Sequence, residues 1–240
     1  MPLAATVGDP AGAPPLYHLP GFHEPVSAVS HLLGAALFLL LGLALLRRGR
    51  GDRTRLAFLG AYAGSCVLLF ALSGTYHMMV RGGAASRVLA RLDHGAIFVL
   101  IAGTFTPAHG LLFRGWLRWA PLALMWAAAA AGVALKTVFF DELAEWLGLS
   151  SYLALGWLGA ASALLMARRY GFRLITPLLY GGLAYTAGGL LEFLRWPVLV
   201  PGVVHAHELF HLAVLAGALC HWRFVWRLAA GWAPPPRPAA

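Results

Sequence analysis

The chain has 240 residues, of which 60% are hydrophobic and 11% are charged, and its mean hydropathy is +0.73. A water-soluble domain carries roughly 25% charged residues, so this chain has too few to cover a surface that faces water. Its net charge of +9 would suit a nucleic-acid partner, but the arginines gather in short segments between apolar runs, where they act as topology signals. The composition predicts an integral membrane protein that has no nucleic-acid partner.

Residues 1–23 are rich in Ala, Gly and Pro and contain no Lys or Arg. Because a secretory signal peptide begins with positive charge, we expect a short flexible N-terminal tail followed by an uncleaved first helix. Both cysteines, Cys66 and Cys220, fall inside apolar runs, which argues against a disulfide framework. Residues 228–240 are expected to form a C-terminal tail.

Seven apolar runs follow the N-terminal tail, and each is near the roughly 20 residues that a membrane-spanning helix needs. They cover residues 24–46, 56–80, 92–113, 117–136, 148–167, 174–194 and 205–227. Short joints with Gly, Pro or Arg separate them, and a proline, Pro121, is expected in the first turn of the fourth helix. The runs predict one all-α domain over residues 24–227, a seven-transmembrane helix bundle.

The distribution of Lys and Arg predicts the orientation of this bundle. Thirteen of the 18 lie in the C-terminal tail and in the joints after the first, third and fifth runs, whereas five lie in the other joints. The positive-inside rule then places the C-terminus in the cytoplasm and the N-terminus outside.

A candidate metal site begins with His207 and His211, which lie four residues apart and therefore on one face of the seventh helix. His77 ends the expected second helix, and Asp93 starts the expected third. With seven spanning helices, these three helix ends must lie at the same membrane face. Three imidazoles and one carboxylate can therefore converge there.

Three histidines and a water molecule make an open tetrahedral site of the kind that catalytic zinc (Zn²⁺) occupies. Zinc lowers the pKa of its bound water and supplies hydroxide near neutral pH. Asp93 is a candidate general base, a group that holds the water, or a group that orients a ligand imidazole. Ser73 lies one helical turn before His77 and can hydrogen-bond the water or an oxyanion.

Two other interpretations apply to these residues. The run from His207 to His211 also matches the HExxH pattern of zinc proteases, in which Glu208 would be the general base. No clear third protease ligand follows, so an intramembrane protease is the weaker alternative. Isolated histidines at helix ends usually lie at the membrane interface, and Glu192 is within ion-pair reach of Arg195 on a helix. The interfacial interpretation is applied to His18, His23, His109, His205 and His221.

Three blocks of the chain together resemble the hemolysin III family, which belongs with the progestin and adipoQ receptors and, more distantly, the alkaline ceramidases. They are SGTYH at 73–77, LDHGAIFVLIAGTFTP at 92–107 and HELFHLAVLAGALCHW at 207–222. The placement of Glu24-Pro25 and Ser30-His31 is also similar. The resemblance implies a seven-helix fold with zinc held by His77, His207 and His211, and with Asp93 and Ser73 close to the metal or its water.

The resemblance also implies a function, since adiponectin receptors and ceramidases are associated with the hydrolysis of ceramide-type amides. We therefore expect a zinc-dependent hydrolase of a lipid amide or ester in the bacterial inner (plasma) membrane, with membrane lipids as its partners. The alternative is a non-enzymatic hemolysin or lipid-sensing receptor in which zinc is structural. The adiponectin receptors place the N-terminus and zinc on the cytoplasmic side, whereas the arginine count of this chain favours the opposite orientation.

Overall fold

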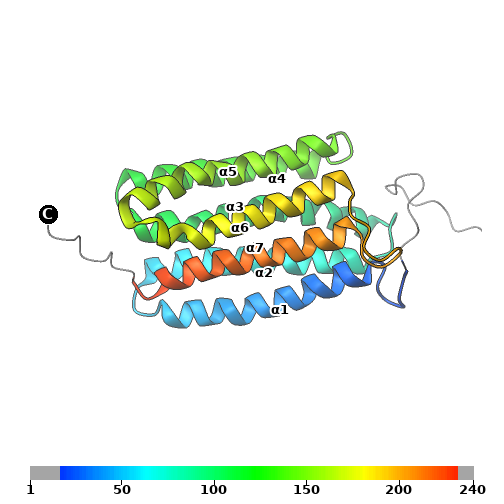
Figure 1. Ribbon diagram of the computed structural model, residues 1–240, viewed down its shortest axis with the longest axis horizontal. Helices are drawn as coiled ribbons and strands as arrows, with labels where there is room; N and C mark the ends of the chain where they lie inside the picture. The colour runs from blue at the N-terminus through cyan, green and yellow to red at the C-terminus, as the bar shows by residue number, and fades with distance from the viewer. Residues whose placement is uncertain (1–16, 232–240) are drawn as a thin grey trace, which may run out of the picture.

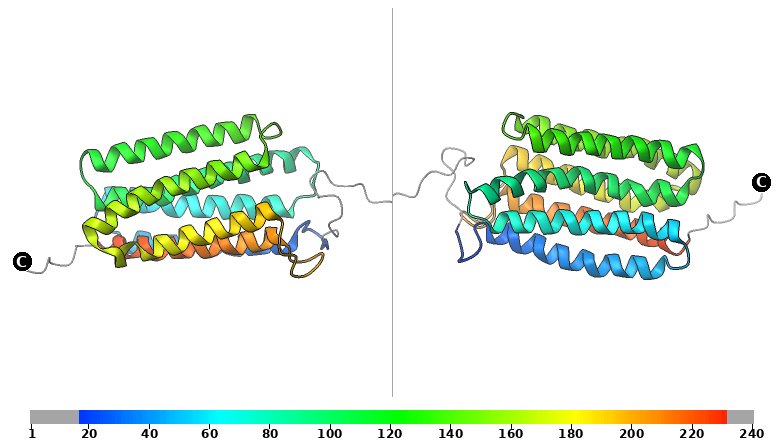
Figure 2. Two further views of the ribbon diagram at one scale, coloured as in Figure 1. Left: turned by 45° about the horizontal axis from the view of Figure 1, so that its top comes forward. Right: turned by 180° about the vertical axis from the view of Figure 1, so that it is seen from behind.

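In the computed structural model of the protein, the structure is described for residues 17–231, and seven long helices make up most of it (Figure 1). The helices are α1 (Pro25–Arg48), α2 (Arg53–Met78), α3 (Ala84–Leu112), α4 (Trp116–Val138), α5 (Glu145–Tyr170), α6 (Phe172–Leu194) and α7 (Ala206–Ala229). They lie side by side with their long axes roughly aligned, and short loops join them at alternate ends (Figures 1 and 2).

All seven helices are long and apolar enough to cross a membrane. They contain 23 to 29 residues, which at 1.5 Å per residue corresponds to about 35 to 44 Å, more than the ~30 Å hydrocarbon core of a bilayer. Large apolar side chains such as Leu33, Leu40 and Leu124 are exposed on the outside of the bundle, where a membrane would surround them with lipid. The predicted seven-helix integral membrane protein is confirmed.

The packing is tighter on one side of the bundle than on the other. α1, α2 and α7 enclose the main core, in which Phe38, Tyr62 and Phe70 are fully buried. The Tyr62 hydroxyl donates a hydrogen bond to the Ala218 carbonyl at 3.0 Å, which ties α2 to α7. α5, in contrast, packs mainly against α6 and touches α3 and α4 only sparsely. This looser side leaves room for a cavity inside the bundle.

Helix α3 starts at Ala84, eight residues before the predicted start at residue 92. The prediction was wrong because Arg87 and Arg91 interrupt the apolar run. In the structure the Arg91 guanidinium forms an ion pair with Asp141 at 2.6 Å at the edge of the bundle, so that its charge does not enter the apolar interior. Asp93 therefore lies in the third turn of α3 and not at its start.

Pro121 also lies deeper in its helix than predicted, because α4 begins at Trp116. A proline has no N–H group and so leaves the carbonyl four residues earlier without its helical hydrogen bond. That carbonyl belongs to Leu117, and the His109 Nδ1 donates a hydrogen bond to it at 2.9 Å. His109 is therefore a buried helix-stabilising side chain and not the interfacial one that was expected.

The predicted tails fall only partly within the described residues. Residues 1–16 and 232–240 lie outside them. Residues 17–23 lie across the ends of the helices, where the Tyr17 N–H donates to the Gly202 carbonyl at 2.8 Å. The next residue, Glu24, precedes α1, and its N–H donates to the His77 carbonyl at 2.9 Å.

Candidate metal centre

Three histidines meet where the C-terminal end of α2 approaches the N-terminal end of α7. His77 is the second-last residue of α2, and His207 and His211 lie one turn apart near the start of α7. One ring nitrogen from each residue lies within 4.8 Å of the other two, and the Nε2 atoms of His77 and His207 are 3.4 Å apart. The predicted convergence of these three side chains is confirmed, and the group can hold a metal ion.

Carboxylates hold the other ring nitrogens of two of these histidines. Glu24 forms a short hydrogen bond with His77 Nδ1, and Glu192 Oε1 lies 3.0 Å from His207 Nδ1. Each Nδ1 therefore carries the hydrogen, and each Nε2 turns its lone pair toward the centre of the group. Metal-binding histidines are usually oriented by this kind of carboxylate partner, which also makes the ring a better electron donor.

Glu24 is held by two side chains, His77 and Arg81. Arg81 forms a second short ion pair with it, on the carboxylate oxygen that His77 does not use. Burial favours the neutral acid, but the hydrogen bond from His77 and the positive charge of Arg81 act against it, and the pKa of Glu24 lies well below its usual range. An ionised Glu24 is the form that can hold His77 in its tautomer.

The third histidine, His211, has an unpaired ring nitrogen that bears on whether a cation fits this group. The side chain is buried, and its Nδ1 atom has no hydrogen-bond partner among the described residues. Its ring is stacked on His31, with centroids 3.8 Å apart, on the side of the main core. A buried ring nitrogen without a partner loses the hydrogen bonds it would make in water. A cation bound between the three rings would satisfy it, so the residues present fit a metal ion.

The two other predicted site residues lie beside this group. Asp93 Oδ2 is 4.0 Å from His77 Nε2, which is too long for a hydrogen bond and leaves room for a bridging water. Ser73 is buried one turn before His77 on α2 and lines the same cavity as Asp93, His207 and His211. Asp93 and Ser73 therefore both place oxygen atoms in the cavity close to the histidines.

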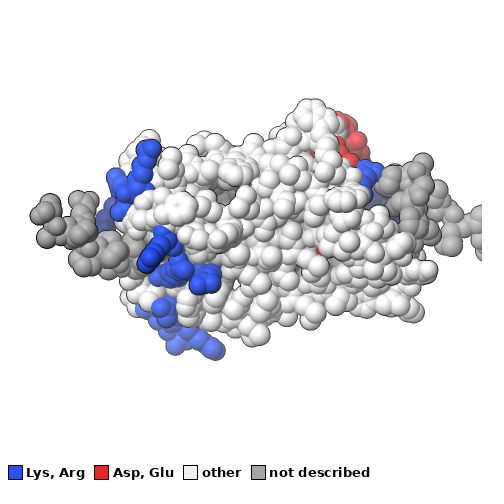
Figure 3. All heavy atoms as spheres, in the orientation of Figure 1, with Lys and Arg blue, Asp and Glu red and all other residues white. Residues whose placement is uncertain are grey.

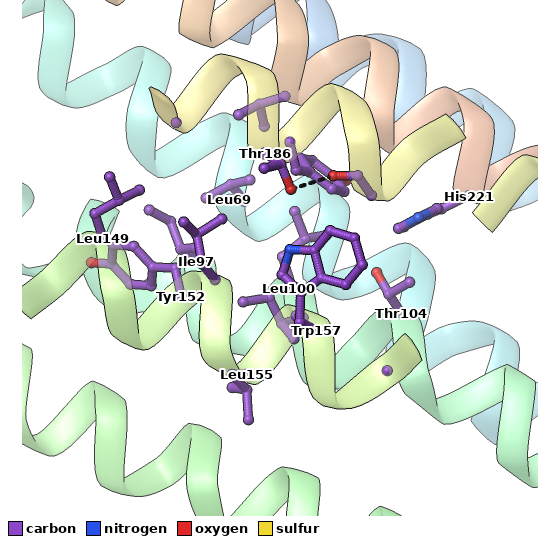
Figure 4. A pocket seen from close by; sticks show the side chains of 18 of the residues that line it. Leu69, Ile97, Leu100, Thr104, Leu149, Tyr152, Leu155, Trp157, Thr186 and His221 are labelled. Atoms are coloured by element: carbon purple, nitrogen blue, oxygen red, sulfur yellow. Dashed lines mark hydrogen bonds between the residues drawn. The ribbon is translucent and has the colours of Figure 1, made fainter. Parts of the chain in front are cut away.

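The cavity has a volume of about 340 Å³ and extends from the histidines toward the middle of the bundle. Its walls come mainly from α2, α3, α5, α6 and α7, and most of its lining is apolar. Figure 4 shows Leu69, Ile97 and Leu100 along it, with Leu149 and His221 on opposite sides of the view. Its chemistry suits an apolar chain that ends in a polar group at the histidines.

Glu208 does not face the metal group, although it completes the HExxH pattern. One of its carboxylate oxygens accepts a hydrogen bond from the Ser27 hydroxyl at 2.9 Å, and the other accepts one from the His205 N–H at 2.9 Å. This second contact is part of a capping box that starts α7. One oxygen thus holds α1 against α7 and the other caps the start of α7, which disfavours the protease interpretation.

Two expectations about single residues were wrong. Glu192 pairs with His207, whereas Arg195 forms its ion pair with Glu145 at 3.0 Å. His221 is not at the membrane interface but lines the cavity from within α7. The role of Glu192 could have been predicted by counting membrane crossings, because the end of the sixth helix must lie at the same membrane face as the start of the seventh. Glu24 was noted only for its placement, and no sequence spacing links it to His77.

Comparison with known proteins places the matching region across the whole bundle. A family profile described as "Haemolysin-III related" matches residues 21–222. The chain is 30% identical over 200 residues to Hemolysin-3 of Bacillus cereus, covering 81% of this chain and 86% of that protein. It is 27% identical over 197 residues to the Hemolysin-3 homolog of Bacillus subtilis strain 168, covering 81% and 89%. It is also 25% identical over 240 residues to the ADIPOR-like receptor IZH1 of Eremothecium gossypii, covering 85% and 71%.

Proposed function

This chain belongs to the haemolysin-III related family, and from that premise we propose that it is a zinc-dependent membrane hydrolase that acts on a lipid amide or ester. The observation that carries the proposal is the position of the three-histidine group, which lies at one end of an apolar cavity with Asp93 and Ser73 beside it. A metal held only for structure has no need of such a cavity.

His77, His207 and His211 would hold the ion. Imidazole nitrogens suit zinc, and three protein ligands with one open position are typical of catalytic zinc sites. When bound in such a site, zinc polarises a carbonyl and supplies hydroxide near neutral pH. Glu24 and Glu192 hold the Nδ1 atoms of His77 and His207, so that the Nε2 lone pairs are ready to bind.

Asp93 is the group that we expect to move protons. Its carboxylate lies 4.0 Å from His77 Nε2 and is 9% exposed, so a water can fit between the two. Asp93 can take a proton from that water and later give it to the leaving nitrogen or oxygen of the lipid. The Ser73 hydroxyl can donate a hydrogen bond to the oxygen on which negative charge develops.

The lipid would lie with its acyl chain in the cavity and its amide or ester at the histidines. The sparse packing of α5 on α3 and α4 offers a lateral route from the bilayer. Ceramide-like amides are the substrate class that this proposal favours, because an acyl chain and a polar linkage match the apolar walls and the polar end of the cavity.

The distribution of charge supports an orientation. Lys and Arg gather at the end of the bundle near the C-terminus, whereas most acidic residues of the described part lie at the histidine end (Figure 3). By the positive-inside rule, the histidine end would face outside and the C-terminus the cytoplasm of a plasma membrane. A C-terminal reporter that fluoresces only in the cytoplasm would agree, and one that is active only outside would overturn this orientation.

The experiment for the hydrolase combines metal content with turnover of a lipid amide by the purified protein. Wild type should hold zinc near one ion per chain, and Asp93→Ala should lose activity by about 100-fold or more while zinc stays bound. Asp141→Ala is the matched control, because Asp141 pairs with Arg91 away from the histidines. Retained turnover in Asp93→Ala would remove Asp93 from the mechanism, and absence of zinc in the wild type would sink the proposal.

A non-enzymatic role is the second candidate, since one relative is named Hemolysin-3 and another Hemolysin-3 homolog. In that case the histidines would only join α2 to α7 through the metal. Leakage of empty liposomes caused by the purified protein, and unchanged by Asp93→Ala, would favour this role over the hydrolase.

A further inference from the structure

A second polar group lies in the same cavity, away from the histidine centre. It consists of His221 on α7 and Tyr185 on α6, whose rings meet edge to face with centroids 5.3 Å apart. Both side chains line the cavity. His221 is ten residues beyond His211, which corresponds to about 15 Å along α7. The cavity therefore has two polar positions that are separated by an apolar stretch.

His221 presents a hydrogen-bond acceptor to this region. Its Nε2 atom lies 3.2 Å from the Leu178 carbonyl. Because a carbonyl can only accept, Nε2 must carry the hydrogen of the neutral ring, and Nδ1 is left with a bare lone pair. That Nδ1 atom is buried and has no hydrogen-bond partner among residues 17–231.

The Tyr185 hydroxyl also lacks a hydrogen-bond partner among the described residues, and its oxygen is buried. Two other hydroxyls of the cavity are already paired: Tyr152 donates to the His94 carbonyl at 3.2 Å, and Thr186 donates to the Gly182 carbonyl at 2.8 Å. Two unsatisfied polar atoms on neighbouring rings in an apolar interior are costly unless a ligand or water satisfies them.

Glycines make room for both rings. A Cβ atom on Gly217 would lie 2.8 Å from the Tyr185 ring, and one on Gly181 would collide with the His221 ring. The two side chains thus fill spaces that only glycine leaves open at the contact between α6 and α7. Their positions are fixed by close packing, as a binding group requires.

We propose that His221 and Tyr185 form a subsite that binds a hydroxyl group in the middle of a lipid chain whose polar head lies at the histidine centre. A hydroxyl both donates and accepts, so it can donate to His221 Nδ1 and accept from the Tyr185 hydroxyl. A carbonyl oxygen would leave His221 Nδ1 without a hydrogen bond. A plain hydrocarbon would leave both His221 Nδ1 and the Tyr185 hydroxyl without one. The inference rests on the proposed function only in taking the occupant of the cavity to be a lipid.

The test compares 12-hydroxystearic acid with stearic acid as competitors of a fluorescent fatty acid bound to the purified full chain. Wild type should bind the hydroxylated acid about three- to tenfold more tightly, as one or two net hydrogen bonds predict. Tyr185→Phe keeps the ring and removes only the hydroxyl, so it should lose most of this preference while its affinity for stearic acid stays the same. His221→Phe should lose the preference as well.

Tyr152→Phe is the matched control, because it removes a hydroxyl from the same cavity that already has a partner. It should keep the preference. Equal affinity of wild type for the two acids, as expected if water alone fills the subsite, would overturn the inference, and so would a preference that survives in Tyr185→Phe or no binding of either acid. Thermal unfolding of each variant verifies that it folds.

This measurement needs neither turnover nor zinc, so the two proposals can fail separately. A preference for the hydroxylated acid without any lipid hydrolysis would support the subsite and refute the hydrolase. Lipid hydrolysis without this preference would support the hydrolase and refute the subsite.

Discussion

The histidines of this bundle have two kinds of partner. Where α2 meets α7, His77 and His207 each form a hydrogen bond from one ring nitrogen to a carboxylate. His109 and His221 each form one to a backbone carbonyl instead. All four rings are at least partly buried, so burial does not separate the two kinds. Either partner fixes the tautomer of the ring, but only the carboxylate also brings a negative charge close to a bound cation. A charged partner thus marks two of the three histidines of the metal centre, and the third, His211, has no partner for its Nδ1 atom among the described residues.

The largest effect that this comparison predicts follows from removal of a ring at the metal centre. His207→Ala should reduce bound zinc from near one ion per chain to near zero, because two imidazoles are too few for a stable site. Elemental analysis of the purified protein measures the change. His109→Phe should keep the zinc and instead destabilise the fold by about 1–3 kcal/mol, since it leaves the Leu117 carbonyl without its donor. Zinc that is retained in His207→Ala would contradict the assignment.

A smaller effect is expected from neutralisation of the partner alone. Glu192→Gln keeps a group of the same shape beside His207 but removes its charge, so zinc affinity should fall about 10- to 100-fold. Competition with a chelator of known affinity measures it. Glu145→Gln is the control, because Glu145 pairs with Arg195 and touches no ligand histidine. If the two variants bind zinc equally, then the charge of the partner does not distinguish the two kinds of histidine.

The smallest effect concerns a histidine held by a carbonyl. Gly181→Ala would press a methyl group against the His221 ring and to within 3.0 Å of the Gly217 carbonyl, so it should lower stability by about 1–3 kcal/mol without loss of zinc. At the adjacent Gly182 a methyl group meets nothing within 4 Å. Gly182→Ala should be neutral or stabilise the helix by up to about 1 kcal/mol. Thermal unfolding in detergent compares the pair, and equal melting temperatures would show that α6 and α7 are not closely packed here.

Much of the fold could be predicted from the sequence because a membrane-spanning helix has a length and composition that few other segments share. The errors arose where charge or proline enters a helix. Arg91 made the predicted start of α3 too late, because its pairing with Asp141 depends on a residue 50 positions away. Pro121 was placed at a helix start because nothing in the sequence shows that His109 compensates for its missing N–H.

The candidate site was predictable to the extent that it depends on helix periodicity and on the parity of seven spans. These bring His77 to the face that holds His207 and His211, and spacing alone puts His207 and His211 on one side of α7. The carboxylates depend on tertiary approach: Glu24 reaches His77 from a segment that crosses the helix ends, and Glu192 reaches across from α6. Such contacts leave no local pattern in the sequence.

The histidine centre also has a consequence for biosynthesis. His77 and His207 are 130 residues apart in the chain, and at ~5–20 residues per second a ribosome needs on the order of ten seconds to make that stretch. During this interval α2 lies in the membrane with one ligand and cannot retain an ion. The three histidines come together only once the seventh helix has been inserted and docked, so a metal held by them would be bound only by the fully assembled chain.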